Sequence, residues 1–186
     1  MDGREKKKLY DFIRNSAATR VTLNRTNDGS KMQGSQVTGL SGEDFLEVER
    51  FQNYGFSSVP PDGAEGIALP VGGDRGHLVV VAIEDRGVRK GGLGAGDVAI
   101  YNGNGDYLLF KEGNKTELKS KEVLFDFGSK MDLKAPIIEI TGDVKIIGNL
   151  TVTGSVSATG DITAGGISLV NHTHPGDSGG TTGKPR

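Results

Sequence analysis

Apolar and polar residues alternate almost without interruption from residue 113 to residue 170. Since successive side chains of a strand point to opposite faces, this period of two predicts extended segments with one apolar side. The apolar residues occupy odd positions from Val123 to Ile137 and even positions from Ile138 onward. Proline lacks an N–H group, so we expect a corner or a bulge at Pro136, where the change occurs.

A glycine recurs every six residues in the later part of this region, at Gly142, Gly148, Gly154, Gly160 and Gly166. The alternating run is longer than an ordinary strand of about five or six residues, and glycine permits a bend without a clash at Cβ. The repeat predicts short strands joined by corners, which is the hexapeptide signature of a β-helix. A Gly/Thr/Ser linker is the alternative, but a linker has no reason to keep strict alternation.

The glycine hexads are too few for one chain to build a β-helix alone. A triangular coil needs three hexads, so the five in this chain give fewer than two coils, with open strand edges and a very small core. Three chains wound around one axis pair every edge. We therefore predict a homotrimeric, intertwined β-helix shaft over residues 113–170, with roughly ten layers and about 45 Å of length. The inward residues shrink to Ala158 and Ala164, so the shaft tapers toward its C-terminal end.

The first 17 residues carry a basic run and then a small apolar group. This group consists of Leu9, Tyr10, Phe12 and Ile13. Apolar residues at spacings of three and four predict an amphipathic helix over about residues 4–15. This N-terminal arm, residues 1–17, is either such a helix, available for docking, or a frayed terminus.

Short alternating or apolar runs, separated by turn residues, fill residues 18–112. The runs that predict strands are Arg20–Asn24, Gln36–Leu40, Glu47–Phe51, Gly66–Val71 and His77–Ile83. Asp97–Tyr101 and Asp106–Phe110 flank a Gly/Asn turn, which predicts a hairpin. Five or six short strands in this length predict a small closed barrel, so we expect an all-β chain that begins with an OB-fold domain over residues 18–112.

The composition is lean for a globular monomer, with 34% hydrophobic residues, 30 glycines and no tryptophan. Such a composition is normal where several chains share one core. The net charge of −2, without a basic and aromatic stripe, predicts no nucleic-acid partner. The lack of cysteine excludes disulfides and thiolate metal sites. No apolar run is long enough for a signal peptide or a membrane span, so we expect synthesis in the cytoplasm of a host cell.

Two histidines, His172 and His174, open the C-terminal segment of residues 171–186. Residues i and i+2 of an extended segment share a face, so both imidazoles point to the same side. One pair supplies too few ligands for a metal, but three chains on a common axis bring six imidazoles together. Iron(II) fits six nitrogen donors better than tetrahedral zinc does. We predict one structural iron per trimer at His172 and His174, and the alternative is an exposed pair near a flexible end.

The residues after the histidine pair, 176–186, are rich in Gly, Ser and Thr. We expect them to fold back over the metal as a small cap and then to fray. Asp177 and the neighbouring hydroxyl groups form a candidate site for a hard cation.

Several segments occur in the order found in one known family. They are Met32–Gly34, Tyr54–Pro60, Asp97–Tyr101, the glycine hexads and Asn171–His174. With these segments, nearly the whole chain resembles the central spike, or baseplate assembly protein V, of Mu-like contractile-tailed phages. The resemblance implies an OB-fold base, a trimeric β-helix and a metal-bound C-terminal apex. There His172 and His174 hold one iron, and further ions can bind. It also implies a place at the baseplate tip of the virion and binding to the baseplate hub and tail tube proteins. The spike meets the host outer membrane there and pierces it when the sheath contracts.

A structural spike is the function that these features favour, and we expect no enzymatic activity. A hexapeptide-repeat acyltransferase is one alternative, but it needs more coils and a catalytic histidine between subunits. The histidine outside the terminal pair, His77, opens an apolar strand, where a packed or capping role is expected. A spike that cleaves peptidoglycan would need an inserted domain or paired carboxylates. The spike of a phage-derived secretion or injection device remains a further alternative.

Overall fold

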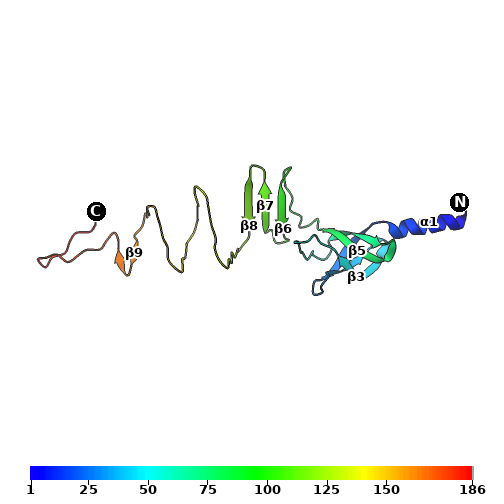
Figure 1. Ribbon diagram of the computed structural model, residues 1–186, viewed down its shortest axis with the longest axis horizontal. Coiled ribbons are helices and arrows are strands. Elements are labelled where there is room, and N and C mark those ends of the chain that lie inside the picture. Colours follow the sequence, from blue (N-terminus) through cyan, green and yellow to red (C-terminus); the bar gives the residue numbers. More distant parts are fainter. Residues whose placement is uncertain (186) are drawn as a thin grey trace. The chain divides into compact units, whose positions relative to one another are not determined.

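The computed structural model describes residues 1–185, with Ser41 described by its backbone alone. The chain divides into two compact units, Met1–Asp126 and Phe127–Arg186 (Figure 1). Within the described residues, no helix is both long and apolar enough to cross a membrane.

The chain begins with helix α1 (Gly3–Ser16), which confirms the predicted helix over the frayed terminus. Asp2 caps it, because its side chain accepts hydrogen bonds of 2.8 Å from the N–H groups of Arg4 and Glu5. The Glu5 carboxylate accepts the Asp2 N–H in return, which completes a capping box. No residue of α1 is buried, although the helix contacts the neighbouring barrel strands.

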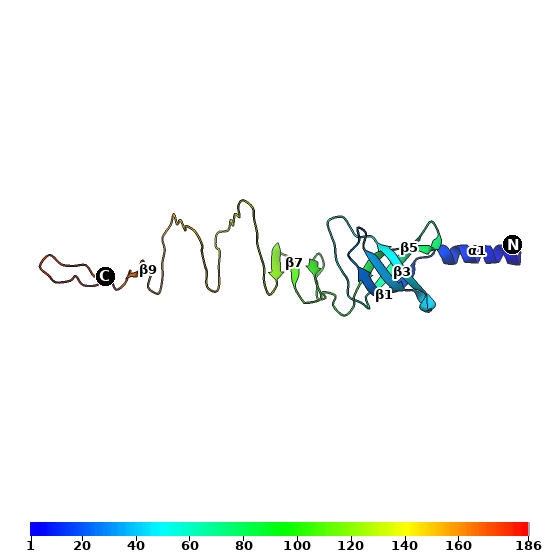
Figure 2. The ribbon, with the colours of Figure 1, turned by 90° about the horizontal axis from the view of Figure 1, so that it is seen from below.

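Five strands form the predicted barrel. They are β1 (Thr19–Asn27), β2 (Gly34–Thr38), β3 (Asp44–Arg50), β4 (Glu65–Val71) and β5 (Asp74–Glu84). The barrel closes in the order β1-β2-β3-β5-β4, with β3 and β5 parallel and the other neighbours antiparallel (Figure 2). A short 3₁₀ helix, η1 (Leu40–Gly42), joins β2 to β3. The predicted small barrel is thus present, and its five strands are the number that an OB-fold has.

Small aliphatic side chains fill the barrel. The buried cluster consists of Val21, Leu23, Val37, Val48, Ala64, Ala68, Leu78 and Val80. In β1, Val21 and Leu23 alternate with exposed residues, as the period of two predicts. His77 is exposed on β5, so of the two roles expected for it the packed one is wrong, and the capping one stays a prediction.

A charged side chain, Arg50, is also buried, at 9% exposure. It donates to Gln33 Oε1 at 2.6 Å, to the Ser58 carbonyl at 2.6 Å and to Ser58 Oγ at 3.0 Å. Burial lowers the pKa of the Arg50 guanidinium, and the nearby charge of Asp28 opposes that shift. These bonds tie β3 to the loop that follows it, in which Tyr54 is fully exposed.

A second sheet follows the barrel. It consists of β6 (Val98–Tyr101), β7 (Tyr107–Lys111) and β8 (Lys115–Lys119), in that order. The predicted hairpin is present, but it joins β8 and is not part of the barrel. The segment 18–112 therefore holds the barrel and most of a separate sheet, because β8 continues the meander into residues assigned to the shaft.

The second unit consists of extended segments that turn back and forth (Figures 1 and 2). Bends or turns lie at Pro136 and at all five hexad glycines. The backbone φ angles of Gly142 and Gly148 are 125° and 140°, a region that disfavours side chains with a Cβ. The strands of this unit, β9 (Thr163–Ala164) and β10 (Ile167–Ser168), form a short hairpin. The predicted corners are thus present in a single chain.

Candidate functional site

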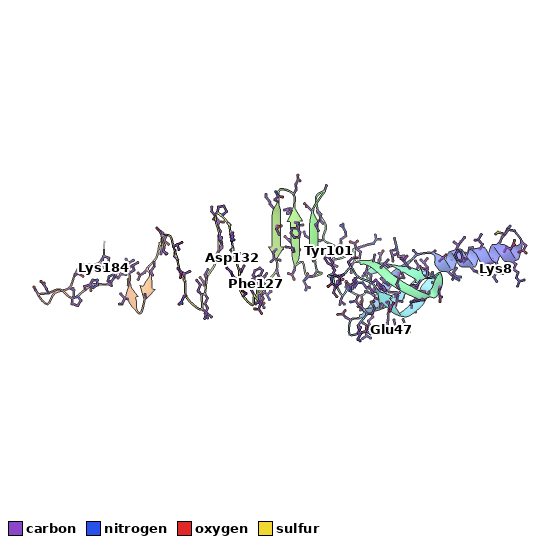
Figure 3. All side chains as sticks on the ribbon, viewed as in Figure 1. Lys8, Glu47, Tyr101, Phe127, Asp132 and Lys184 are labelled. Carbon is purple, nitrogen blue, oxygen red and sulfur yellow. The ribbon has the colours of Figure 1, made fainter. Side chains whose placement is uncertain are left out.

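The shaft region presents its apolar side chains to solvent. No described residue from 121 to 185 is buried. The exposed apolar residues include Phe125, Met131, Leu133, Ile137, Ile140, Val144, Ile146, Leu150, Val152, Val156 and Ile162, at 41–74% exposure. Figure 3 shows the side chains of this region as sticks along a single extended backbone, with Phe127 and Asp132 labelled. A row of this length has no core of its own within the described chain.

Asp161 organises the hairpin that precedes the histidines. Its Oδ1 accepts the Val170 N–H at 3.1 Å, and the Leu169 N–H donates to the Ile162 carbonyl at 2.8 Å. A hydrogen bond from the Ser168 side chain, followed by the one from the Val170 N–H, lowers the pKa of the Asp161 carboxyl. The carboxylate therefore closes the hairpin by bridging its two ends.

Gly165 and Gly166 form the turn of this hairpin, with φ angles of 59° and 81°. Positive φ at both central residues is the requirement of a type I′ turn, which glycine meets without strain. The Gly–Gly pair between two short alternating runs was the sequence signal for this turn. The prediction of a hexad corner at Gly166 did not include this hairpin.

The structure brings the two predicted histidines together. The imidazole rings of His172 and His174 lie with centroids 5.1 Å apart and at 86° to each other. His172 Nδ1 lies 2.8 Å from the Ser168 carbonyl oxygen, which can only accept a hydrogen bond. Nδ1 therefore carries a proton, and in the neutral ring Nε2 has the lone pair that a metal ion would need. His172 is half-buried and His174 is exposed.

The residues after the histidines fold back on them. The Thr182 N–H donates to the His174 carbonyl at 2.9 Å, and the His174 N–H donates to Thr182 Oγ1 at 2.9 Å. Gly176 N–H reaches the Gly180 carbonyl at 2.7 Å, and Lys184 Nζ donates to Asn171 Oδ1 at 2.7 Å. These contacts confirm that the segment turns back, and they hold the backbone of His174 from both sides.

One chain does not complete a metal site by itself. Among the described residues, no group of three or more His, Asp or Glu side chains is arranged to hold a metal ion. The pair His172 and His174 offers two imidazoles on one side of the chain, and Asp177 is not gathered with them. Any further ligands would have to come from outside this chain.

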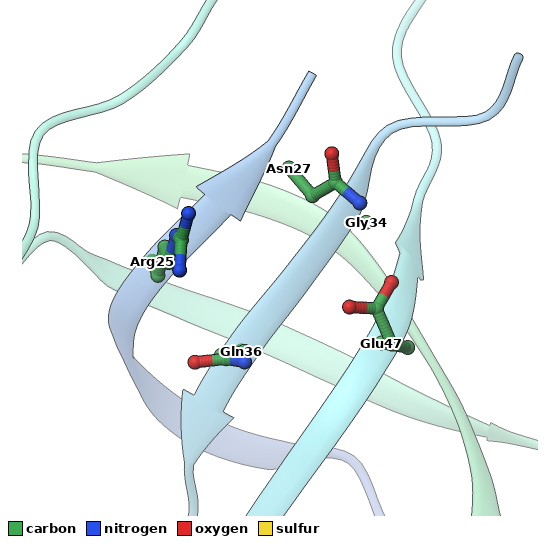
Figure 4. A pocket seen from close by; sticks show the side chains of 5 residues that line it. All are labelled: Arg25, Asn27, Gly34, Gln36 and Glu47. Atoms are coloured by element: carbon green, nitrogen blue, oxygen red, sulfur yellow. The ribbon is translucent and has the colours of Figure 1, made fainter. Parts of the chain in front are cut away.

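A small polar pocket lies on the barrel, with a volume of about 210 Å³. Figure 4 shows Arg25 on β1, Gln36 on β2 and Glu47 on β3 around it, beside Asn27 and Gly34. Glu47 has a φ of 57°, and a Cβ at Gly34 would lie only 2.9 Å from Glu47 Oε2. The pocket is smaller than the ~300–1,000 Å³ of ordinary ligand sites and has no aromatic ring for stacking.

The sequence is similar to known proteins along most of its length. Residues 20–87 match the family model of Bacteriophage Mu Gp45, N-terminal, and residues 166–186 match the GpV Apex motif. The chain is 39% identical over 169 residues to the baseplate puncturing device gp45 of Escherichia phage Mu, covering 88% of this chain and 86% of that protein. It is 36% identical over 162 residues to the Mu-like prophage FluMu protein gp45 of Haemophilus influenzae, covering 84% and 85%.

Proposed function

The chain belongs to the phage Mu Gp45 family, and from this premise we propose that it is the puncturing spike of a phage tail baseplate. It is a virion component, located at the baseplate. The apex motif at residues 166–186 supports a role in which the C-terminal end meets the host outer membrane as the tail contracts. The function is structural, with no chemical turnover.

We infer that three copies form the working spike. The observation that carries this inference is the alternating apolar row of residues 121–162, which is exposed throughout in one chain. Burial of an apolar side chain of this size stabilises by about 1.5–3 kcal/mol, so an uncovered row of this length is costly. Three chains around one axis would cover the row and pair the extended segments into an intertwined β-helix.

The sheet β6-β7-β8 supports the same assembly. Residues directly opposite each other in neighbouring strands lie on the same face of a sheet. Val98 pairs with Phe110, and Ile100 and Leu118 both pair with Leu108. One face of this sheet therefore carries Val98, Ile100, Phe110 and Leu118. These four side chains are 47–58% exposed, whereas Leu109 on the opposite face is 5% exposed. An apolar sheet face of this kind is expected to pack against another chain.

The two histidines fit a shared metal. The Ser168 carbonyl fixes the His172 tautomer, so Nε2 is free to ligate, and the His174 ring lies beside it. Three chains would supply six imidazoles, a donor set suited to one octahedral iron(II) without an open position. When bound, the metal would crosslink the three chains. The residues of this chain would orient the two rings through the Ser168 and Thr182 contacts.

Force transmission follows from the architecture proposed here. A rod in which every strand is paired between chains resists bending, because each layer is held by hydrogen bonds and by a shared apolar core. The tapering side chains would concentrate axial force at the C-terminal tip. The baseplate hub and tail tube proteins would bind the N-terminal unit, which holds the barrel and the β6-β7-β8 sheet.

Two measurements on the purified full-length chain test this proposal. Light scattering should give the mass of three chains, and elemental analysis should give one iron per three chains. A monomeric mass would refute the trimer, and a trimer without any transition metal would refute the iron site alone.

The puncturing role has its own assay. Tails assembled without the chain should bind host cells yet fail to admit a dye that the intact outer membrane excludes. The chain supplied from a plasmid should restore dye entry. Equal dye entry with and without the chain would contradict the spike function.

A further inference from the structure

Helix α1 carries four large apolar side chains that nothing in the described chain covers. Leu9, Tyr10, Phe12 and Ile13 are 47%, 68%, 66% and 56% exposed. At 100° per residue, Leu9, Phe12 and Ile13 fall within one apolar face, with Tyr10 at its border. Figure 3 shows the α1 side chains, including Lys8, projecting outward from the helix. The helix therefore presents an unpartnered apolar face.

The helix is nevertheless held in place. The capping box at Asp2 fixes its first turn, and near its other end Arg14 Nη2 lies 3.3 Å from Glu43 Oε1. Glu43 also pairs with Arg75, whose guanidinium is 5.8 Å above the Phe45 ring. The Arg75 contact, with a smaller contribution from Arg14, lowers the pKa of the Glu43 carboxyl, so this linkage is charged at neutral pH. A helix ordered before binding loses less conformational entropy when a partner engages it.

The polar face of α1 is basic. Lys6 and Lys8 border the apolar face, because at 100° per residue they lie about 20° from Ile13 and about 40° from Phe12. The opposite side of the helix carries Arg4, Lys7 and Arg14, with Asp11 among them. A complementary surface therefore offers an apolar groove bordered by carboxylates. This is the helix-in-groove mode of recognition, with anchors at spacings of three and four residues.

A second copy of α1 does not fit this description. A coiled coil needs apolar residues at a and d positions over at least three heptads, and α1 spans only 14 residues. If Leu9 and Phe12 occupy a and d positions, the other a and d positions are Asp2, Glu5 and Ser16, which are polar. Copies of a basic helix also repel one another. The charge and the missing seam both favour a different protein.

We propose that the apolar face of α1 docks into an acidic-rimmed groove on another protein of the tail baseplate. This inference rests on the spike function proposed above. It assigns α1 as an attachment element, distinct from the shaft and the apex. An anionic membrane, which a basic amphipathic helix can also bind, is the competing occupant that the test must exclude.

The test is incorporation of variants into tails. Cells that carry the phage without the gene for this chain would receive it from a plasmid, and the chain would be quantified in purified tails. Replacing Leu9, Phe12 and Ile13 by Gln keeps helix propensity and removes the apolar face. Asn15→Gln, on the polar face, is the matched control. We expect at least a tenfold loss of incorporation for the triple variant and no loss for the control.

Each other result has a defined meaning. Normal incorporation of the triple variant, or of a chain lacking residues 1–16, overturns the docking proposal. A triple variant that loses its oligomeric mass also overturns it, because α1 would then contact another copy. Binding of the full chain to phosphatidylglycerol vesicles, lost in the triple variant, overturns it in favour of a membrane. Absence of the unaltered chain from tails would instead refute the spike function itself.

Discussion

The parity of the shaft gives the sharpest test of how this chain assembles. Val152 belongs to the apolar row and Thr153, its neighbour, to the polar row. In one chain both residues are exposed, Val152 at 48%. If chains do not associate, Val152→Asp and Thr153→Asp are equivalent surface changes, and each costs little.

A threefold assembly makes the two variants very different. Position 152 then occurs three times around one axis, inside the shared core. An unpaired buried carboxylate costs several kcal/mol, so three of them cost on the order of 10 kcal/mol or more. That amount matches the whole stability of a typical domain, about 5–15 kcal/mol. Thr153→Asp places its three carboxylates in solvent, where the cost stays small.

The assay compares the full-length variants at neutral pH. Light scattering gives the oligomeric mass, and electrophoresis in SDS without heating reports the resistance of the assembly. We expect Val152→Asp to be monomeric or to dissociate far below the temperature at which the unaltered chain does. Thr153→Asp should behave like the unaltered chain.

Val152→Ala supplies an intermediate point. It removes two buried carbons per chain, which at ~0.8 kcal/mol per carbon is about 1.6 kcal/mol per chain and about 5 kcal/mol for three chains. The trimer should therefore persist with lower thermal stability. Equal stability of Val152→Asp and Thr153→Asp would refute the shared core and, with it, the alternation argument.

Three further expectations concern single contacts. Arg50→Ala should lower the free energy of unfolding of the barrel by about 1–3 kcal/mol, because it leaves the buried Gln33 Oε1 without its donor. Arg86→Ala, at an exposed ion pair, should leave that free energy nearly unchanged, and calorimetry on the two variants compares them. The pKa of Asp161 is lower in the folded chain than in the unfolded chain. Its carboxylate therefore stabilises the hairpin above the pKa of the unfolded chain, and this stabilisation is lost as the pH falls through the pKa of the folded chain. Asp161→Asn should therefore loosen residues 161–170 at neutral pH, measured by amide hydrogen exchange, and the difference from the unaltered chain should vanish in acid. Replacing both His172 and His174 by Gln should abolish iron binding, and acidification of the unaltered chain should release the metal because protonated imidazole cannot ligate; retained iron in elemental analysis would contradict the site.

The strands of the barrel were predictable because their burial follows a simple period. Each predicted run overlaps an observed strand, and the observed strands begin or end up to three residues away. Arg50 shows what the pattern leaves out. Alternation puts it on the same face as buried Val48, but charge argues for solvent. Arg50 can be buried because Gln33 and Ser58 supply acceptors for its guanidinium. These residues are not adjacent to Arg50 in sequence, so no local pattern predicts the contacts.

The corners of the shaft and the orientation of the histidines were also predictable from local chemistry. Glycine and proline mark the bends, and the spacing of two residues brings the imidazoles of His172 and His174 together. The contacts of Asp161 and Lys184 were not predictable, since each joins residues nine or more positions apart in sequence. The positive φ of Glu47 was also not predictable, because it depends on the register shift between β2 and β3.

The exposed apolar surfaces of the shaft and of α1 obey different symmetry rules, and this difference predicts different partners. Along the shaft, a threefold axis would bring three identical residues together in every layer, so a regular repeat is complementary to its own copies. The apolar face of α1 has no repeat that rotation could match, and its basic border favours an acidic surface instead. A surface that repeats can be covered by copies of itself, whereas one that does not requires a different protein. In the proposed trimer, the shaft would assemble the spike, and α1 would attach it to the baseplate.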